Sequence, residues 1–374
     1  MKSEIGKALD KIKENQIGLS KKQACIGFDG FIDSIIRIMK HKSPDQKHQY
    51  FDTIADFGTF LISQSGQSCS VELKEYLCKI GGNMPIFANA LGSMGIAVNC
   101  IGALGYPKIH PLFEPMRQNQ CTLYSVSEPG LTSALEFNDG KVMLIRIEAL
   151  DNLTWDTIKN RVGLDLIINF FSASDLIGIV NWSEIEHTTG IWQGILKEIV
   201  PELACAKEKI LYFDLADCSK RSDVDIQEVL QLIPAYSRTF RTVLGINENE
   251  ARILFRVFFA TPGAATASIP SIGEKLSRRL GVDVLVIHPR DGAWAWENGR
   301  CCHVRTRLIE HPKISTGGGD NFNAGFCLAQ LLGMDLSASL IAANAVSGFY
   351  VQNGFSPSLD QLCAFLQEWQ EAVN

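Results

Sequence analysis

The sequence has no uninterrupted run of about 18 apolar residues, which is the length that a membrane-spanning helix needs. It also has no basic block, because 35 lysines and arginines are spread among 41 aspartates and glutamates, for a net charge of −6. Proteins that bind the phosphate backbone of nucleic acids usually carry a clustered basic surface. We therefore expect neither a membrane span nor a nucleic acid partner.

Cysteines with the spacing of a metal or redox site are also missing. The 11 cysteines are odd in number and scattered through apolar runs, without C-x-x-C or Cys/His ligand spacing. Cys301 and Cys302 are adjacent, which leaves a redox or zinc role as the weaker alternative to reduced core residues. The first 16 residues place apolar side chains at helical spacing among charges, as in a surface helix rather than a signal peptide. These patterns favour a cytoplasmic protein.

The sequence does contain a repeated alternation of short apolar runs and amphipathic segments. Its 374 residues are 46% hydrophobic and 20% charged, which is ordinary for a globular protein with a large core. Six runs have the pattern of buried strands, at residues 23–28, 97–103, 164–170, 209–215, 242–247 and 282–287. Near-continuous apolar strands are typical of a parallel sheet that is buried on both faces. We predict a doubly wound α/β body with a mainly parallel sheet.

One region breaks this alternation and predicts a small antiparallel β lid. Residues 121–127, 131–137 and 141–149 are β-rich and follow one another across the turn signals EPG and NDG, without a helical segment between them. Short turns of this kind join antiparallel strands. We expect a single domain over residues 1–374, with the lid inserted mainly from residues 34–50, 69–80 and 121–148.

The lid is also the predicted surface for self-association. We expect it to present an apolar face, and exposed sheet faces or edges are natural pairing surfaces. The candidates for part of this face are Leu123, Leu135, Phe137 and Leu144. A homodimer through the lids is therefore a candidate assembly.

The stretch KISTGGGDNFNAGF, residues 313–326, joins three consecutive glycines to an aspartate and a helical pattern. Apolar side chains recur at helical spacing over residues 321–332, so the glycines lie at a helix N-terminus, where free N–H groups and the helix dipole attract anions. The stretch is neither a Walker A loop nor a G-x-G-x-x-G dinucleotide motif. Asp320, beside a transferring phosphoryl group, can accept the proton of an attacking hydroxyl. Its alternative role is that of a helix cap.

Two stretches resemble the signatures of the ribokinase-like, or PfkB, carbohydrate kinases. STGGGDNFNAGF, residues 315–326, is similar to their C-terminal pattern D-T-x-G-A-G-D-x-F, and KIGGNMPIFANALGSMG, residues 79–95, is similar to their N-terminal GGN signature. The order of the two stretches and the lid strands between them extend the resemblance over almost the whole chain. The resemblance implies a ribokinase-like fold and the transfer of a phosphoryl group from ATP, with Mg²⁺, to a hydroxyl of a small-molecule sugar or sugar-like substrate.

The resemblance also carries catalytic and acceptor roles onto individual residues. The implied catalytic set is Asp320 as general base with Gly317, Gly318 and Gly319 around the phosphoryl group. The implied acceptor set is Asp33 as first choice and Asp29 as second, from IGFDGFID, with Gly82 and Asn83 from the GGN stretch. An amide that both donates and accepts hydrogen bonds suits sugar hydroxyls. Turn or cap chemistry is the alternative role of both aspartates near the first strand.

Metal and nucleotide roles follow in the same way. Asn247 and Glu250 match the family's N-x-x-E spacing, which is associated with the Mg²⁺ and phosphate network, with a solvated helix surface as the alternative. The residues implied near the nucleotide are Asn344, Gly292, Gly354 and Ser356. Three further candidates to line the cleft follow a buried strand, where ligands bind in open α/β sheets: Asp214, Lys220 and Arg221. Strand-end salt bridging is their alternative role.

Several positions depart from the family pattern. Ile314 and Ser315 replace the aspartate and threonine of the C-terminal signature, which leaves a monovalent cation such as K⁺ uncertain. Ile86 replaces the second asparagine expected after GGN, so one polar contact to a usual sugar is missing. The segment VIHPRDGAW, residues 286–294, keeps one glycine of the family's T-x-G-x-x-G. Arg290 in this segment is a candidate phosphate contact, with an ordinary surface arginine as the alternative.

The leading hypothesis is a cytoplasmic, ATP- and Mg²⁺-dependent kinase that acts on a hydroxyl of a sugar or sugar-like substrate. The altered GGN helix leaves a nucleoside or other non-sugar kinase of the same fold as the first alternative. The altered segment at residues 286–294 leaves a catalytically silent ligand-binding regulator as the second. Retention of Asp320 and of all three glycines argues against the regulator, because a protein that only binds has little need of them.

Overall fold

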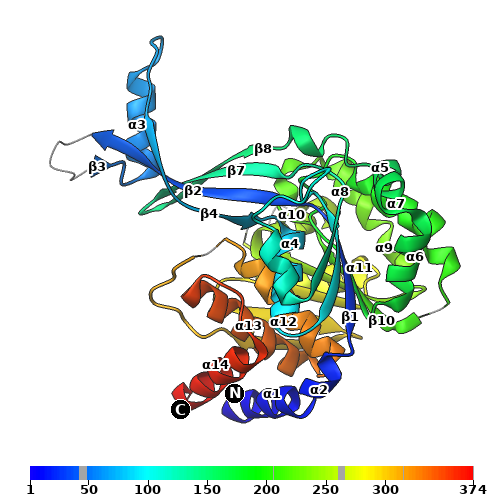
Figure 1. Cartoon of the computed structure of the whole chain (residues 1–374). Coiled ribbons are helices and arrows are strands. Elements are labelled where there is room, and N and C mark those ends of the chain that lie inside the picture. The colour runs from blue at the N-terminus through cyan, green and yellow to red at the C-terminus, as the bar shows by residue number, and fades with distance from the viewer. Residues whose placement is uncertain (42–48, 205, 260–265, 315, 374) are drawn as a thin grey trace.

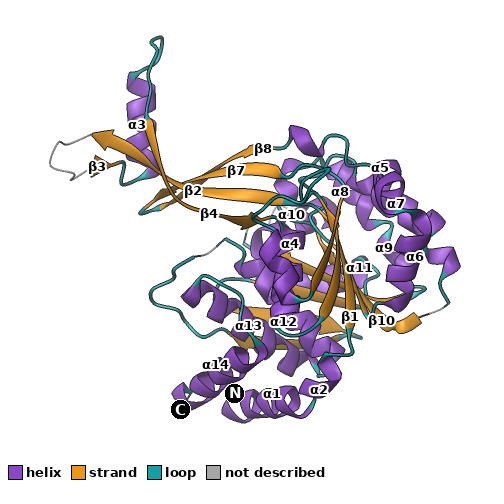
Figure 2. Cartoon of the chain, in the orientation of Figure 1, coloured by secondary structure: helices purple, strands orange, loops and turns teal. Residues whose placement is uncertain are grey.

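The computed structural model describes residues 1–41, 49–204, 206–259, 266–314 and 316–373. Within these residues the chain forms two β-sheets. One has nine strands and is surrounded by helices, and the other has five strands and projects from it (Figures 1 and 2). The predicted fold class, a doubly wound α/β body with a small separate β sheet, is confirmed.

The large sheet runs in the order β14-β13-β12-β11-β10-β9-β1-β5-β6. Its strands are β1 (Gln23–Phe28), β5 (Ala97–Gly102), β6 (Cys121–Ser125), β9 (Leu176–Ile179), β10 (Ala206–Asp214), β11 (Phe240–Asn247), β12 (Val284–His288), β13 (Gly292–Glu297) and β14 (Arg300–Arg305). All pairings from β12 to β6 are parallel, and β13 and β14 extend one edge in antiparallel fashion. The carboxyl ends of the parallel strands therefore meet at one edge of the sheet, where ligands bind in open α/β folds.

Helices cover both faces of this sheet (Figure 2). The core on one face includes α1 (Lys2–Glu14), α4 (Asn83–Ser93), α12 (Gly318–Leu331), α13 (Leu336–Asn353) and α14 (Leu359–Ala372). The core on the other face includes α5 (Trp155–Val162), α6 (Leu164–Ala173), α7 (Thr188–Glu198), α8 (Asp223–Leu230), α9 (Ile233–Tyr236), α10 (Glu248–Phe259) and α11 (Ile269–Arg279). The short helix α2 (Gln16–Leu19) follows α1.

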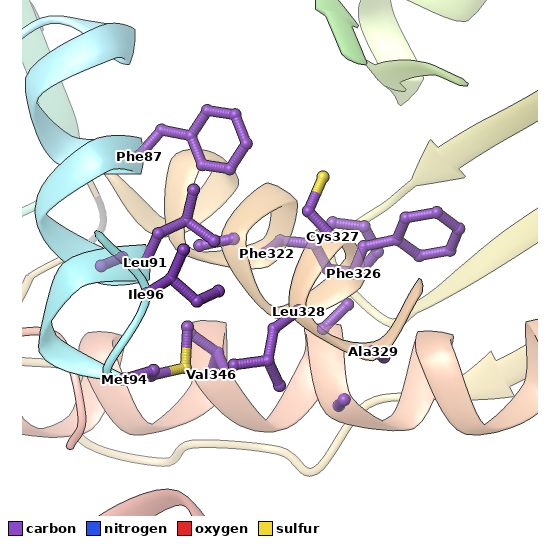
Figure 3. Close-up of a cluster of buried hydrophobic side chains, with 14 of the residues drawn as sticks. Phe87, Leu91, Met94, Ile96, Phe322, Phe326, Cys327, Leu328, Ala329 and Val346 are labelled. Atoms are coloured by element: carbon purple, nitrogen blue, oxygen red, sulfur yellow. The ribbon is translucent and has the colours of Figure 1, made fainter. Parts of the chain in front are cut away.

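Apolar packing fixes the direction of α12, the helix that follows the glycine stretch. Figure 3 shows Phe322 and Phe326 of α12 packed between Phe87 and Leu91 of α4 and Val346 of α13. Burial of each large apolar side chain contributes roughly 1.5–3 kcal/mol. Rotation or tilting of α12 would therefore break several such contacts, so its N-terminus is held in place.

Five of the six apolar runs are strands, and the sixth is not. Residues 164–170 form most of α6, and the buried strand is the next apolar run, β9. In α6 the buried side chains are Ile167, Phe170 and Phe171, which share one face at helical spacing. A continuous apolar run is compatible with either a buried strand or a buried helix, so periodicity alone misassigned this segment.

The five-stranded sheet is the lid, and its far end carries helix α3 (Ile54–Ser63) (Figure 1). Its strands are β2 (Phe31–His41), β3 (Gln49–Tyr50), β4 (Glu72–Gly81), β7 (Gly130–Phe137) and β8 (Gly140–Arg146). β2 pairs with β3 and β4 in antiparallel fashion and with β7 in parallel fashion, and β7 and β8 form the predicted hairpin.

The predicted lid segments need two corrections. Residues 121–125 form β6, which pairs with β5 in the large sheet, so Leu123 belongs to the main core and is 7% exposed. Leu135 and Phe137 are not on an exposed face, because α3 covers them, and α3 was not predicted. Leu144 alone of the four candidates is exposed, at 55%. Residues 42–48 of the predicted lid lie outside the described residues.

Candidate active site

The N-terminus of α12 is open at the position that the glycine stretch predicts. The helix begins at Gly318, and Gly317 occupies the N-cap with a left-handed φ of 95° and no side-chain cap hydrogen bond. Asp320 lies in the first turn and is not at the cap position. The first N–H groups of a helix have no partner within it, so an uncapped N-terminus is suited to an anion.

The three glycines differ in what surrounds them. A Cβ on Gly317 would lie 2.7 Å from Tyr350 Oη, and its positive φ is itself unfavourable for other residues. A Cβ on Gly318 would lie 3.3 Å from a Val351 methyl group, so this glycine allows α12 to approach α13 and does not open a phosphate path. Gly319 is exposed, and a Cβ there would meet only His288, at 3.5 Å. Gly319 therefore offers the bare backbone.

Asp320 interacts electrostatically with the carboxyl groups of Asp29, Asp214 and Glu250, which come from separate elements. We call these four residues the carboxyl cluster. Burial raises the pKa of Asp320 well above the usual range, and the nearby carboxylates of Asp214 and Asp29 raise it further. Lys79 acts in the opposite direction and favours the ionised form. A carboxylate with a raised pKa is a stronger proton acceptor than an ordinary one.

Asp29 anchors the start of α4. Its two carboxylate oxygens accept hydrogen bonds from the N–H groups of Asn83, at 2.8 Å, and Met84, at 2.7 Å, and one of them also accepts from Asn181 Nδ2 at 2.6 Å. The residue is fully buried, and burial raises its pKa to about 7 against the effect of these donors. A Cβ on Gly82 would lie 2.5 Å from the same carboxylate. Asp29 therefore caps the N-terminus of α4, which is the alternative role that the sequence left open for it.

Asp33 lies on the lid, in register with Lys79 of β4 and Thr132 of β7. It is 4% exposed. Burial raises its pKa, while Lys79, a hydrogen bond with Thr132 and the charge of Lys141 lower it. Gly81 has no side chain because a Cβ there would lie 2.4 Å from the Asp33 carboxyl. Asp33 is therefore a charged group held at the base of the lid.

Two lid lysines connect the lid to the glycine turn, and the sequence analysis assigned no role to either. Lys79 Nζ donates to Tyr350 Oη at 3.0 Å and to the Thr316 carbonyl oxygen at 3.4 Å. Tyr350 Oη donates to the same carbonyl oxygen at 2.9 Å. Lys141 of β8 hydrogen-bonds the Thr316 hydroxyl. Burial lowers the pKa of both lysines.

Asp214 reaches the cluster from the end of β10. It accepts hydrogen bonds from Ala216 N at 2.7 Å and from Asn323 Nδ2 of α12 at 2.7 Å. Burial raises its pKa, and these bonds, together with one from the Asn83 side chain, lower it. Lys220 and Arg221, in contrast, are bonded to the loop after β9, Lys220 to Glu184 and Arg221 to backbone carbonyls. Lys220 thus makes the local salt bridge of the alternative role, while Arg221 makes hydrogen bonds to the backbone.

Asn247 and Glu250 are bonded to one another. Asn247 N donates to Glu250 Oε2 at 2.9 Å, Glu250 N donates to Asn247 Oδ1 at 3.0 Å, and Asn247 Nδ2 donates to Glu250 Oε1. Glu250 is 4% exposed, so the solvated-helix alternative is wrong, and burial raises its pKa well above the usual range. Each Glu250 oxygen accepts one hydrogen bond from Asn247 and keeps a further lone pair, so the role of the pair in the Mg²⁺ and phosphate network stays a prediction. Over the described ranges, no group of three acidic, histidine or cysteine side chains could hold a metal ion.

The remaining nucleotide candidates have structural contacts of their own. Asn344 is buried on α13 and its Nδ2 lies 3.5 Å from the Val304 carbonyl oxygen. Gly354 ends α13 with a φ of 83°, and a Cβ on Gly292 would lie 2.7 Å from the same Val304 oxygen. Ser356 follows α13 and is half-buried. Within the described part of the chain, none of these four residues forms a hydrogen bond or an ion pair with the carboxyl cluster.

The departures from the signature also have visible consequences. Ile86 is buried on α4 and lies against Gly317, since its Cδ1 would be 3.1 Å from a Cβ there. An apolar side chain thus replaces an amide beside the glycine turn. Arg290 is exposed and acts electrostatically on Lys141. Ile314 N donates to the Val351 carbonyl oxygen at 3.4 Å, and Ser315 lies outside the described residues.

Comparisons with known proteins find matches along nearly the whole chain. A family model described as prokaryotic ketohexokinase matches residues 5–369. A ketohexokinase from Haloferax volcanii is 29% identical over 341 residues, which cover 91% of this chain and 89% of the relative.

Solved structures with a similar fold include Arabidopsis thaliana ribokinase complexed with ribose and ATP, with a TM-score of 0.65, 16% identity, and coverage of 92% of this chain and 98% of that one. Thermotoga maritima ribokinase has a TM-score of 0.63 at 18% identity, with coverage of 92% and 99%. A putative ribokinase II from E. coli in complex with ATP and Mg²⁺ has a TM-score of 0.63 at 16% identity, with coverage of 93% and 99%. At these identities the similarity shows the ribokinase-like fold alone.

Proposed function

Because the chain belongs to the prokaryotic ketohexokinase family, and is thus a PfkB-type carbohydrate kinase, we propose that it transfers the γ-phosphoryl group of ATP to a hydroxyl of a ketohexose. The ketohexose follows from the name of the curated relative, and ATP with Mg²⁺ follows from the ligands of the ribokinase neighbours. The observation that carries the proposal is Asp320, a half-buried carboxyl in the first turn of an uncapped helix.

In the proposed reaction Asp320 is the general base. It takes the proton of the attacking hydroxyl, and its raised pKa makes the carboxylate a better acceptor. The exposed Gly319 N–H and the positive end of the α12 dipole stabilise negative charge on the phosphoryl group as it moves. The lid excludes water, which would otherwise compete as the acceptor.

The sugar is held at the base of the lid. Asp33 accepts hydrogen bonds from sugar hydroxyls, and the Asn83 side chain supplies an amide that both donates and accepts. Asp29 acts on the sugar indirectly, because it fixes the backbone of Asn83, and Gly82 lets the two approach. A monovalent cation site at the helix and loop of residues 343–358 stays a prediction.

Nucleotide and metal have different support. The proposed nucleotide residues are Asn344, Gly292, Gly354 and Ser356, which depend on the family resemblance. When bound, Mg²⁺ would supply positive charge that stabilises the phosphates during transfer. Asn247 and Glu250 are the residues proposed for this Mg²⁺ and phosphate network, from the family's N-x-x-E spacing, and no step is assigned to the metal through them.

The test is ADP release from purified protein against ketohexoses, aldohexoses, polyols and nucleosides. We expect turnover with a ketohexose at a kcat/KM at least tenfold above that of any nucleoside. A nucleoside as the best acceptor would favour the non-sugar kinase, which the apolar Ile86 beside Gly317 supports. Ligand binding without ADP release from any acceptor would favour the regulator and overturn the proposal.

We also propose a homodimer in the cytoplasm. Strand β4 is an exposed edge of the lid, and Leu73, Tyr76 and Leu77 on it are 52%, 48% and 46% exposed. A second copy of the lid would cover this edge, which sheet proteins usually protect. None of the helices in the described ranges is long and apolar enough to cross a membrane.

A further inference from the structure

Lys79 is a lid residue that reaches three separate segments of the site. It lies on β4 in register with Asp33, two residues before Gly81. Its Nζ donates to Tyr350 Oη at 3.0 Å and to the Thr316 carbonyl oxygen at 3.4 Å. Thr316 directly precedes Gly317, the N-cap of α12. Lys79 therefore joins the lid to α13 and to the turn that carries the catalytic helix.

The charge of Lys79 also acts on Asp320. The groups in electrostatic contact with Asp320 are the carboxyls of Asp29, Asp214 and Glu250, the phenols of Tyr212 and Tyr350, and the ammonium of Lys79. The carboxyls oppose ionisation of Asp320, since like charges in one site disfavour each other, and the ammonium favours it. Lys79 thus offsets part of the repulsion that the other acids impose on the base.

We propose that Lys79 is a positioning residue for phosphoryl transfer: from the lid it places a positive charge beside the carboxyl cluster, and it holds the Thr316 carbonyl so that the glycine turn keeps its orientation. The inference rests on the proposed role of Asp320 as general base. Lys79 acts through Asp320 and Thr316, without contact to the transferred group. A lid strand thereby contributes to the ionisation state of a residue on the main body.

Lys141 provides a matched comparison within the same lid. It is also partly buried, and it also bonds to Thr316, through the hydroxyl. The groups that act on it electrostatically include Glu136, Asp33, Arg290 and Lys79. A purely mechanical connection between lid and turn would make the two lysines equivalent. An electrostatic role would distinguish them.

The experiment is the pH dependence of kcat/KM for the best ketohexose, measured on five variants and the wild type. Lys79→Gln removes the charge and keeps donors for Thr316 and Tyr350, Lys79→Met removes both, and Lys79→Arg keeps the charge. Lys141→Met is the matched comparison, and the exposed Lys74→Met on the same strand is the control for activity. We expect the acid limb, which reports the base in the free enzyme, to move up by about one pH unit in the Gln and Met variants.

Lys79→Arg keeps the positive charge and Lys141→Met leaves Lys79 in place, so both variants should keep the acid limb within about 0.3 pH units of the wild type. Loss of an opposite charge near a base, in contrast, shifts its pKa by about one unit or more. If Lys79→Met has a lowered melting temperature, the acid limb of Lys79→Gln is the result that tests the inference. A wild-type acid limb in a folded Lys79→Gln protein would overturn the inference and leave the proposed function intact. A wild type without turnover on any sugar would instead overturn the proposed function, and the inference with it.

Discussion

Asn247 and Glu250 cap each other at the start of α10, through two backbone N–H groups and one side-chain amide. This reciprocal arrangement satisfies donors that a helix N-terminus otherwise leaves open. Glu250→Ala should lower the free energy of unfolding by about 1–2 kcal/mol, the upper range for loss of a cap. Thermal and urea denaturation measure this loss.

A second variant, Glu250→Gln, separates capping from metal binding. If the pair acts through the metal, Glu250→Gln should raise the Mg²⁺ concentration for half-maximal rate severalfold, and by more than it raises the acceptor KM. An unchanged Mg²⁺ dependence would leave the pair with its capping role alone.

Asp320→Asn tests the general base directly. The variant keeps the volume of the side chain but cannot accept the proton, so kcat should fall by roughly 10²-fold or more. Because Asp320 is not at the cap position, binding of sugar and nucleotide and the melting temperature should be retained. A variant with the wild-type kcat on its best sugar would refute the mechanism while leaving the fold assignment in place.

Gly318 and Gly319 offer a matched pair of substitutions. Gly318→Val places a branched side chain against Val351 and Ser347 of α13, so it should destabilise the fold by about 1–3 kcal/mol, as overpacking does. Gly319→Val faces open space apart from His288. It should keep the melting temperature and raise the nucleotide KM at least tenfold. Equal effects of the two changes on melting temperature would show that the glycines do not divide their roles in this way.

The carboxyl cluster predicts that the ligand-free protein loses stability as the pH rises. Burial raises the pKa of Asp29 from its usual value of 3.8 to about 7, so the folded state holds a proton that the unfolded state has released. The stabilisation is fully present below about pH 4 and is lost between about pH 4 and 7. Asp33, Asp214, Glu250 and Asp320 contribute with the same sign. The full effect of Asp29 is on the order of 2–4 kcal/mol.

Melting temperatures at pH 5, 6, 7 and 8 measure this dependence. Asp29→Asn should flatten the slope, whatever its effect on the absolute melting temperature, because the substituted side chain does not titrate. A melting temperature that rises from pH 5 to pH 7 in the wild type would contradict the assignment of raised pKa values to this cluster.

The lid edge predicts a dimer at micromolar concentration. Leu73→Glu and Tyr76→Glu place charges on the exposed edge strand, so the double variant should sediment as a monomer while the wild type sediments as a dimer. Lys40, at the far end of the lid, forms an exposed ion pair with Asp56 and provides the control position. A monomeric wild type would exclude the lid as a stable interface.

The body of the fold was predictable from the sequence because its strands are apolar on both faces. The family was also predictable, since the glycine stretch and the GGN stretch are short, local and specific, and the comparisons confirm a PfkB carbohydrate kinase. Residues 121–125 were misassigned because a turn signal does not reveal that the chain passes from one sheet to another. Helix α3 went unnoticed because none of its side chains is fully buried.

The site was only partly predictable because its contacts are long-range. Lys79 lies within a stretch that the sequence analysis singled out, yet its partner Thr316 is 237 positions away. The register that places Lys79 opposite Asp33 depends on pairing between β2 and β4, which local patterns do not specify. The cap made by Asp29 was an open alternative, the cap made by Glu250 was not predicted, and only the hydrogen bonds identify them.

Two of the chain's passages between body and lid are very short. β1 ends at Phe28 and β2 begins at Phe31, while β4 ends at Gly81 and α4 begins at Asn83. The carboxylate of Asp29 in the first passage accepts a hydrogen bond from Asn83 at the end of the second, so the two are fastened together. A rotation of the lid about this fastening would displace α3, at the far end, by the greatest distance and Asp33, next to the fastening, by the least. The tip could then move while the carboxylate proposed to bind the sugar stays near its place.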